Sequence, residues 1–364
     1  MPSIAQESLK TVPLSYATVS VGTPTTPLPK KLDAISSAGF TGIEMGFPDL
    51  LSFASSFHSK SIPEDDYESL SSTASEIQKL CKEKSLKIMM LQPFSNFEGW
   101  PAGSSERKEA FERAKGWIKI MHALGTDMLQ VGSTDTPASK LDLSRERIVK
   151  DLQELADLLA KNKFRMAYEN WCWSTHAPAW KDVWEIVKEV DRDNVGLCLD
   201  TFQTVGSEYA DPSSKSGILE ISSQDELRQK YTTSLKNLTS EIPPEKIYLL
   251  QLSDAYIPPS PLDPDQPDGS PASGKELRAR GRWSHDYRPY IHGKGAYTRE
   301  CVEMCKAVLA TGNRAWFSLE VFDGGKEGKG GSGTGMSEDE GEMKEFCKGA
   351  MEGTKWVLGE CVDK

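Results

Sequence analysis

The sequence lacks any long apolar segment. Its longest apolar runs have the length of a β-strand, such as residues 43–47, which Glu44 interrupts. A helix that spans a membrane needs about 20 consecutive apolar residues, so we expect no membrane partner. The start of the chain, Met1–Ser3, does not combine positive charge with an apolar stretch, so we expect no secretion signal either.

Positive charge is also in short supply. The 364 residues include 43 basic and 54 acidic side chains, which gives a formal net charge of −11. Such a field repels phosphate backbones, so we do not expect nucleic acid as a partner. A small anionic substrate remains compatible, because a few local arginines can outweigh a distant negative field. The seven cysteines are odd in number and scattered, which is typical of reduced thiols in a cytoplasmic protein.

A glycine-rich phosphate turn is missing after the first strand-like segment, which argues against a doubly wound open sheet. Instead, short apolar runs alternate with segments of helical period. The eight strand-like runs are Leu14–Ser20, Gly42–Phe47, Leu86–Phe94, Asp127–Ser133, Phe164–Trp171, Val195–Thr201, Ile247–Asp254 and Ala315–Phe322. The helical stripes cover residues 28–38, 67–77, 111–121, 148–159, 183–190, 227–238, 304–308 and 340–358. This alternation predicts one (β/α)₈ barrel that occupies residues 1–364.

Two segments interrupt the alternation. Residues 255–295 form a long connection after the seventh strand, rich first in proline and aspartate and then in arginine and histidine. Connections of that length inside a compact domain are usually functional, so we expect an active-site loop. Residues 324–341 are rich in glycine, serine and glutamate, and we expect a flexible segment that contributes to a lid.

Polar side chains stand near the ends of four consecutive strand-like runs. They are Glu169, Asp200, Gln251 and Glu320. The active site of a barrel lies at the carboxyl ends of its strands, so these groups should meet there. Burial of three carboxylates without a cation is costly, and an all-oxygen ligand set suits Mg²⁺ or Mn²⁺. The alternative for each acid alone is a helix cap or a salt bridge at the end of a strand.

Histidine and arginine offer further candidates on the same rim. One of the five histidines, His122, falls on a predicted helix. The other four fall in predicted loops that open on the carboxyl ends of the strands: His58, His176, His285 and His292. His176 is the best candidate for a catalytic group, because it follows Glu169 within a tryptophan-rich segment. Arg282 and Arg288 in the long loop are suited to capture a substrate carboxylate. A solvated basic loop is the alternative for the arginines, and a solvent-exposed role is the alternative for the histidine.

At these residues the chain resembles the xylose-isomerase-like barrel superfamily, and within it the fungal 3-dehydroshikimate dehydratases of quinate catabolism. The similar stretches are Leu91–Gly99, Tyr168–Asn170 with His176, Gly196–Phe202, Gln251–Ala255, Arg282–Ser284 with Arg288–Pro289, and Ser318–Phe322. They extend from the third strand to the eighth. The resemblance implies a lyase that dehydrates 3-dehydroshikimate to protocatechuate.

The resemblance also implies that Glu169, Asp200, Gln251 and Glu320 hold one divalent ion: Mg²⁺, Mn²⁺ or Co²⁺. Two positions depart from the related sugar epimerases, which usually have histidine where this chain has Gln251 and often where it has Gln203. Gln203 cannot act as a general base, so these departures count against a sugar epimerase. A ketose or sugar-acid epimerase on the same barrel and a metal-free binding barrel are the alternative functions. A DNA-repair endonuclease of this fold is disfavoured, because its multi-metal site needs more histidines.

For the dehydratase we expect His176 to remove the substrate proton, with Glu169 or Glu320 as the alternative base. Gln92 and Gln203 are expected to orient substrate hydroxyls. Arg282 or Arg288 is expected to bind the substrate carboxylate.

Overall fold

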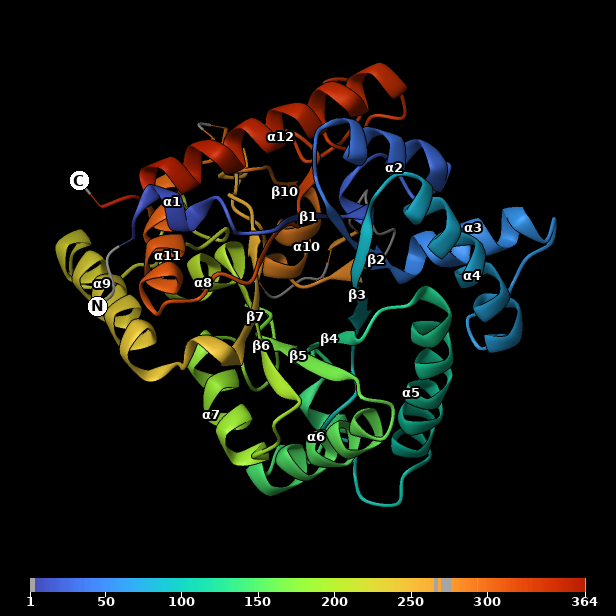
Figure 1. The fold of residues 1–364 in the computed structure, drawn as a ribbon. Helices are drawn as coiled ribbons and strands as arrows, with labels where there is room; N and C mark the ends of the chain where they lie inside the picture. Colours follow the sequence, from blue (N-terminus) through green and yellow to red (C-terminus); the bar gives the residue numbers. More distant parts are fainter. Residues whose placement is uncertain (1–3, 265–267, 270–275, 293, 364) are drawn as a thin grey trace.

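The barrel wall consists of eight parallel strands. The computed structural model describes residues 4–264, 268–269, 276–292 and 294–363 (Figure 1). The wall closes in the order β1-β11-β7-β6-β5-β4-β3-β2. Its strands are β1 Leu14–Ala17, β2 Gly42–Gly46, β3 Lys87–Phe94, β4 Met128–Gly132, β5 Arg165–Glu169, β6 Val195–Asp200, β7 Ile247–Leu252 and β11 Trp316–Leu319. The predicted (β/α)₈ barrel is therefore confirmed, with each strand inside its predicted run.

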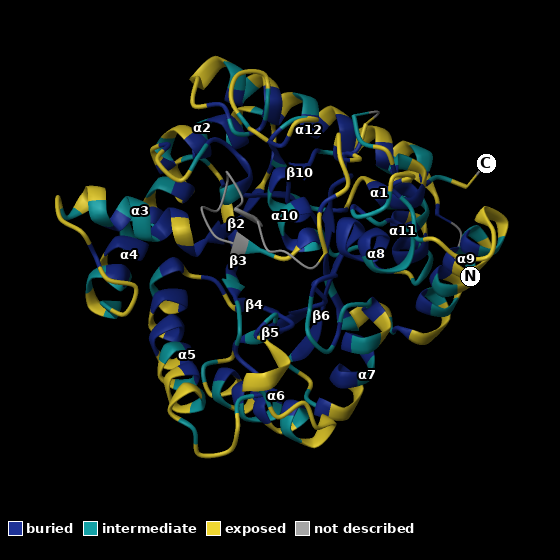
Figure 2. Ribbon diagram, turned by 180° about the vertical axis from the view of Figure 1, so that it is seen from behind, coloured by how far each residue is buried: buried dark blue, intermediate teal, exposed yellow. Residues whose placement is uncertain are grey.

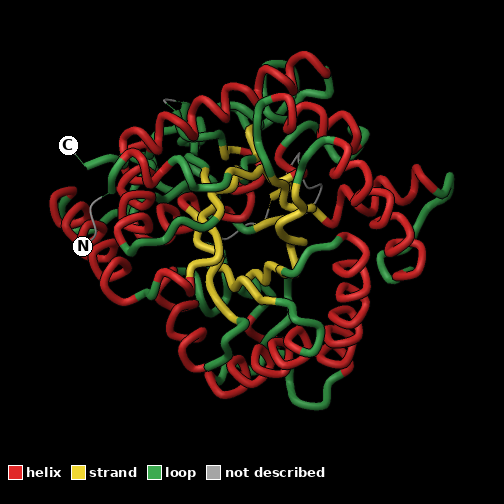
Figure 3. The backbone as a smooth tube through the Cα atoms, viewed as in Figure 1, coloured by secondary structure: helices red, strands yellow, loops and turns green. Residues whose placement is uncertain are grey.

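Helices surround the barrel on all sides (Figure 3). The predicted ones are α2 Leu28–Ser37, α4 Tyr67–Glu83, α5 Ser105–Leu124, α6 Arg145–Ala160, α7 Trp180–Val190, α9 Gln224–Glu241, α11 Thr298–Ala310 and α12 Glu340–Glu360. Their apolar stripes face the strands, so buried residues concentrate on the inner sides of the helices (Figure 2). Serine residues cap the N-termini of several helices. The Ser104 and Ser144 hydroxyls accept hydrogen bonds from the third backbone N–H of α5 and α6, respectively.

Four further helices were not predicted: α1 Gln6–Leu9, α3 Phe47–Phe57, α8 Thr201–Glu208 and α10 Ala279–Asp286. Two of them, α3 and α8, start directly at the carboxyl end of a barrel strand. Asp200 begins α8, because its Oδ1 accepts a hydrogen bond from the Gln203 backbone N–H at 3.1 Å. None of the described helices is long and apolar enough to cross a membrane.

The interior of the barrel has an apolar layer beneath a polar one. The apolar layer is the cluster Met89, Met90, Met128, Ala167, Cys198 and Leu249, packed against Trp316. Gly42 leaves room for the Trp316 ring, whose nearest atom would lie 2.7 Å from an added Cβ. Side chains two residues apart on a strand point to the same face, so the next inward position on each strand lies above this layer. Those positions are occupied by Gln92, Gln130, Glu169, Asp200 and Gln251, all buried.

The long connection after β7 contains short regular elements rather than an extended loop. They are β8 Asp268–Gly269, β9 Glu276–Leu277, α10 and β10 Tyr287–Arg288. Strand β10 pairs antiparallel with β12, Phe322–Asp323, which begins after Glu320 and Val321 at the end of the last barrel strand. Residues 265–267, 270–275 and 293 of the predicted active-site loop lie outside the described residues. The pairing with β12 places this connection over the carboxyl end of β11.

The segment 324–341 contacts both ends of the barrel sequence. The Gly22 N–H donates to the Gly335 carbonyl at 2.9 Å, and the Gly335 N–H donates to the Asp323 carbonyl at 3.1 Å. Tyr287 Oη donates to the Glu327 carbonyl at 3.2 Å. The segment therefore joins the start of the chain to β10 and β12, and its flexibility stays a prediction.

Candidate metal centre

Three buried carboxylates converge at the carboxyl end of the barrel. Glu169 is the last residue of β5, Asp200 is the last residue of β6, and Glu320 directly follows β11. One oxygen from each lies within 4.8 Å of the others, which is close enough for a single ion to contact all three. Parallel strands bring these residues together because their carboxyl ends share one rim.

Arg288 supplies a positive charge inside this cluster. Its Nη1 lies 2.9 Å from Glu320 Oε2, and its Nη2 pairs with Asp200 Oδ2. Its Nε donates to Ser253 Oγ at 2.6 Å. The guanidinium is fully buried and lies 4.9 Å from the centre of the Phe202 ring. The structure therefore places this predicted substrate-binding residue between two predicted metal ligands.

Amide side chains donate hydrogen bonds to several further carboxylate oxygens. Gln92 Nε2 donates to Glu320 Oε1 at 3.0 Å, and Gln130 Nε2 donates to Glu169 Oε2. Gln251 Nε2 donates to Oε2 of Glu44, a buried acid on β2, at 2.9 Å. Each amide thus fixes the orientation of an acidic partner by hydrogen bonding.

The crowding of acids disfavours their ionised forms. Burial, then repulsion from Glu320 and Asp200, raises the pKa of Glu169 well above its ordinary value. Burial and repulsion from Glu320 raise the pKa of Glu44 to about 8. Burial raises the pKa of Asp200 to about 6, although the nearby Arg288 opposes that rise. A bound cation would relieve this repulsion, because opposite charge favours the ionised carboxylate.

Several oxygens in the polar layer also fit a metal ligand role. Oε1 of Glu44, Gln130, Glu169 and Gln251 is buried and has no hydrogen-bond partner among the described residues. A buried oxygen without a partner is costly, and coordination by an ion satisfies it. The donor set consists of carboxylate and amide oxygens, which suits a hard divalent cation. This buried acidic group can therefore hold a metal ion.

Gln203, a predicted substrate-binding residue, lies on α8 beside the cluster. Its Oε1 accepts a hydrogen bond from the Cys172 N–H at 2.8 Å. The side chain thus joins the segment after β5 to the start of α8. Its amide Nε2 is the group that can donate to a substrate hydroxyl.

His176 is paired with an acid that sequence reasoning did not identify. Its Nε2 lies 2.9 Å from Glu98 Oε1, which also accepts a hydrogen bond from Tyr168 Oη at 3.0 Å. Burial raises the pKa of Glu98, but the hydrogen bond and charge of His176 outweigh it, so the pKa is lowered overall. Tyr168 and Glu169 are consecutive on β5 and point to opposite faces. The Glu98–His176 pair is therefore anchored on the outer face of β5, whereas Glu169 points into the barrel.

The other histidines have different surroundings. His285 lies on α10, with its ring stacked on that of Phe322 at 5.5 Å between ring centres. His58 ends α3, and its Nε2 lies 3.2 Å from Thr73 Oγ1 on α4. His292 packs 5.3 Å from the Trp356 ring of α12, and His122 lies exposed on α5. Of these four, only His285 lies against a residue adjacent to the carboxylate cluster.

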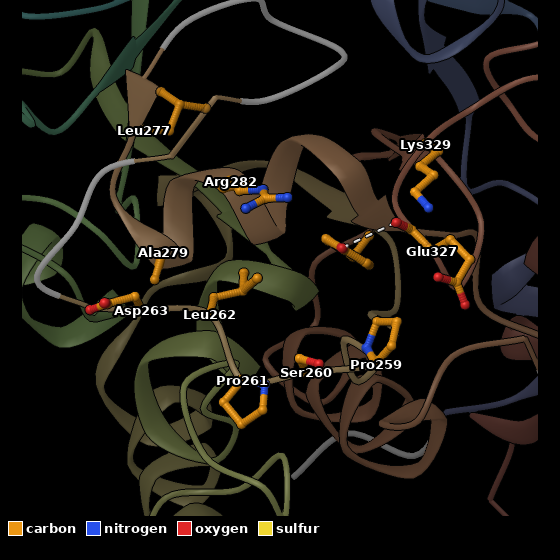
Figure 4. A pocket seen from close by; sticks show the side chains of 11 residues that line it. Pro259, Ser260, Pro261, Leu262, Asp263, Leu277, Ala279, Arg282, Glu327 and Lys329 are labelled. Carbon is orange, nitrogen blue, oxygen red and sulfur yellow. Dashed lines mark hydrogen bonds between the residues drawn. The ribbon is translucent and has the colours of Figure 1, made fainter.

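Arg282 lines a cavity on the other side of β10 (Figure 4). The cavity has a volume of about 540 Å³ and lies between residues 259–263, α10 and residues 327–329. Tyr287 lines it, whereas the next residue, Arg288, faces the carboxylates, as alternation along a strand requires. Arg282 Nε lies 3.6 Å from Asp286 Oδ2. The structure therefore separates the two candidate arginines across β10.

Comparison with known proteins shows the family of the chain. A family model described as xylose isomerase-like TIM barrel matches residues 32–343. The chain belongs to this family.

Relatives of this xylose isomerase-like barrel include 3-dehydroshikimate dehydratases. The one from Neurospora crassa is 34% identical over 304 residues, which are 81% of each chain. The one from Pseudomonas aeruginosa is 30% identical over 312 residues, which are 85% of this chain but 38% of the relative. A solved fusion of a xylose isomerase-like TIM barrel with 4-hydroxyphenylpyruvate dioxygenase is 25% identical. It superposes with a TM-score of 0.67 over 94% of this chain and 42% of the fusion.

Among the side chains that contact the predicted site of this barrel, sequence reasoning missed the acids Glu44 and Glu98 and the amide Gln130. Glu44 and Gln130 interrupt apolar strands in the same way as the predicted ligands do, so the rule applied to β5–β11 would have found them on β2 and β4. Glu98 follows β3 and had no such signal, because its role depends on a contact with His176 that is distant in sequence.

Proposed function

We propose that the protein is a metal-dependent 3-dehydroshikimate dehydratase, a lyase that converts 3-dehydroshikimate to protocatechuate. The observation that carries the proposal is the 34% identity to the Neurospora crassa dehydratase over 81% of both chains. The buried carboxylate group at the carboxyl end of the barrel supports it, because it offers a metal-assisted site for such chemistry.

Glu169, Asp200, Gln251 and Glu320 are the residues that would hold the ion. Their oxygen-only donor set favours Mg²⁺, Mn²⁺ or Co²⁺ in our proposal. When bound, such an ion supplies a Lewis acid that stabilises negative charge on the substrate ketone oxygen. Arg288 adds a second positive charge beside Asp200 and Glu320, so a substrate at this centre would also meet its guanidinium.

Loss of water from the substrate first requires removal of a carbon-bound proton. A proton acceptor must lie within hydrogen-bonding distance of that proton. The geometry favours Glu169 over His176, because Glu169 Oε1 is buried inside the barrel without a partner among the described residues. His176 Nε2 instead contacts Glu98 on the outer face of β5. Glu320 is the second carboxylate candidate, although both its oxygens already contact Gln92 or Arg288.

The remaining proposed roles concern substrate binding. Gln92 Nε2 and Gln203 Nε2 are the amide donors that would orient substrate hydroxyls. Of the two arginines, Arg288 is favoured as the contact for the substrate carboxylate because it lies beside the carboxylate cluster. Its guanidinium pairs with Asp200 and Glu320, and an ion that took these two carboxylates as ligands would leave it able to bind the substrate. Arg282 lines the cavity on the other side of β10. A substrate bound by Arg282 would therefore lie away from Glu169, Asp200 and Glu320.

The experiment that tests this function is an assay with purified protein, 3-dehydroshikimate and Mg²⁺ or Mn²⁺. We expect an aromatic catechol acid, detected by its ultraviolet absorbance and confirmed by mass spectrometry as the substrate minus one water. A variant of an exposed residue, Glu112→Gln, should retain this activity. A protein that leaves 3-dehydroshikimate unchanged but interconverts ketoses or sugar acids would be an epimerase, and the proposal would then be wrong.

A further inference from the structure

Glu44 is a buried acid that contacts the proposed metal centre without belonging to the proposed ligand set. It lies on β2, with β1 between it and β11, the strand that leads to Glu320. Its Oε2 accepts a hydrogen bond from Gln251 Nε2 at 2.9 Å, and Gln92 Nε2 lies 3.4 Å from the same oxygen. Both amides therefore direct their nitrogen ends toward Glu44.

This contact determines the orientation of the Gln251 side chain. An amide has a donor end and an acceptor end, and Glu44 Oε2 faces Gln251 as an acceptor of the hydrogen bond from its nitrogen end. Glu44 therefore selects the nitrogen end of Gln251, which leaves Oε1 directed away from Glu44. That Oε1 is buried without a hydrogen-bond partner among the described residues. An amide that was free to turn would present oxygen or nitrogen, and nitrogen does not bind a cation.

Gln92 extends the contacts of Glu44 to a second proposed ligand. Gln92 Nε2 also donates to Glu320 Oε1 at 3.0 Å, and Arg288 Nη1 contacts the other oxygen of Glu320 at 2.9 Å. A chain of contacts therefore runs from Gln251 through Glu44 and Gln92 to Glu320. Outer residues of this kind orient metal ligands, and their loss typically lowers metal affinity about 10–100-fold.

We propose that Glu44 is a positioning residue for the metal centre, which fixes the Gln251 amide so that Oε1 faces the divalent ion. This inference rests on the metal site of the proposed function and assigns a role to a residue outside that site's ligand set. Glu44 acts through Gln251. Its own Oε1 is also buried without a partner among the described residues, so direct binding of the ion by Glu44 is the outcome that would contradict the inference.

The test is a titration of metal-free protein with Mn²⁺, followed by calorimetry or by the magnetic resonance signal of free Mn²⁺. Glu44→Gln should weaken Mn²⁺ binding about 10–100-fold, because the new amide can donate to Gln251 and turn it. Glu44→Asp keeps the charge but is one methylene shorter, and it should weaken binding by about 10-fold. Glu112→Gln removes one exposed negative charge on α5 and should bind like the wild type.

A double-mutant cycle separates positioning from the loss of charge. In a Gln251→Ala background, Glu44→Gln should change Mn²⁺ affinity less than about threefold, because the amide that it orients is gone. An equal loss in both backgrounds would show that Glu44 acts by charge alone, and the inference would be wrong. Normal Mn²⁺ binding by Glu44→Asp would contradict it as well. Thermal unfolding of each variant shows whether it folds. If Glu44→Gln does not fold, the same cycle is measured with Glu44→Asp.

The outcomes also distinguish this inference from the proposed function. If wild-type protein binds no Mn²⁺, Mg²⁺ or Co²⁺, the metal part of the proposed function fails and this inference fails with it. If the wild type binds the ion and all Glu44 variants bind equally well, only the role of Glu44 is refuted.

Discussion

Arg288→Met should destabilise the metal-free protein. The methionine keeps the side chain packed between Phe202 and Phe322 but removes the charge that pairs with Asp200 and Glu320. Removal of one partner from a buried ion pair typically costs about 3–5 kcal/mol. For 364 residues, the entropy of unfolding is about 0.8 kcal/mol per degree. The cost therefore corresponds to a decrease of about 4–7 °C in Tm.

The assay is thermal unfolding of wild type and variant after exhaustive chelation, with and without saturating Mn²⁺. The ion gives the same carboxylates a new partner, so the difference in Tm should become smaller when it is bound. Arg299→Met is the matched control, because Arg299 is exposed on α11 and, among the described residues, forms its one ion pair with Glu303. Its Tm should change by about 1 °C at most. An Arg288→Met protein as stable as the wild type without metal would refute the role of Arg288 as the internal counter-charge.

Three further predictions concern the site and its surroundings. Glu169→Ala or Glu320→Ala should abolish turnover in a folded protein, and near wild-type turnover of either variant in the ultraviolet absorbance assay would contradict the metal site. Arg288→Ala should weaken substrate binding about 10–100-fold, as measured by KM, and Arg282→Ala should weaken it less. A larger effect of Arg282→Ala would show that the substrate carboxylate binds in the cavity that Arg282 lines. Burial raises the pKa of Glu208 to about 7 from its ordinary value of 4.5, so its stabilising contribution is present below pH 4.5 and is lost as pH rises through 7. The difference in Tm between Glu208→Gln and the wild type should therefore shift in favour of the variant as the pH rises from 5 to 8. A difference in Tm that stays the same over this range would exclude the titration of Glu208.

The barrel fold could be predicted from the sequence because the patterns that indicate its strands and helices lie within short segments of the chain. Each strand was visible as a short apolar run, and each of the eight predicted helices carried an apolar stripe. The helices α3 and α8 were missed because they start within the ends of strand-like runs, at Phe47 and Thr201, without an intervening polar segment. The helix α10 was missed because its sequence is mostly polar and charged and has no apolar stripe.

The candidate site was predictable where its residues end a strand of the barrel wall or directly follow one. The inward positions that hold Glu169, Asp200 and Gln251 follow from the alternation of side chains along β5, β6 and β7. The position of Arg288 did not follow, because it depends on the pairing of β10 with β12 across more than thirty residues of sequence. The direction of His176 likewise depends on Glu98, which belongs to a different connection.

The most direct test of the account is turnover of 3-dehydroshikimate by one protein sample before and after metal is restored. The sample is first chelated until elemental analysis finds no divalent ion, and product is then measured before and after addition of Mg²⁺, Mn²⁺ or Co²⁺. We predict no protocatechuate from the stripped protein, and its appearance once the ion is added. Equal rates of protocatechuate formation in both states, or none in either, would contradict the account.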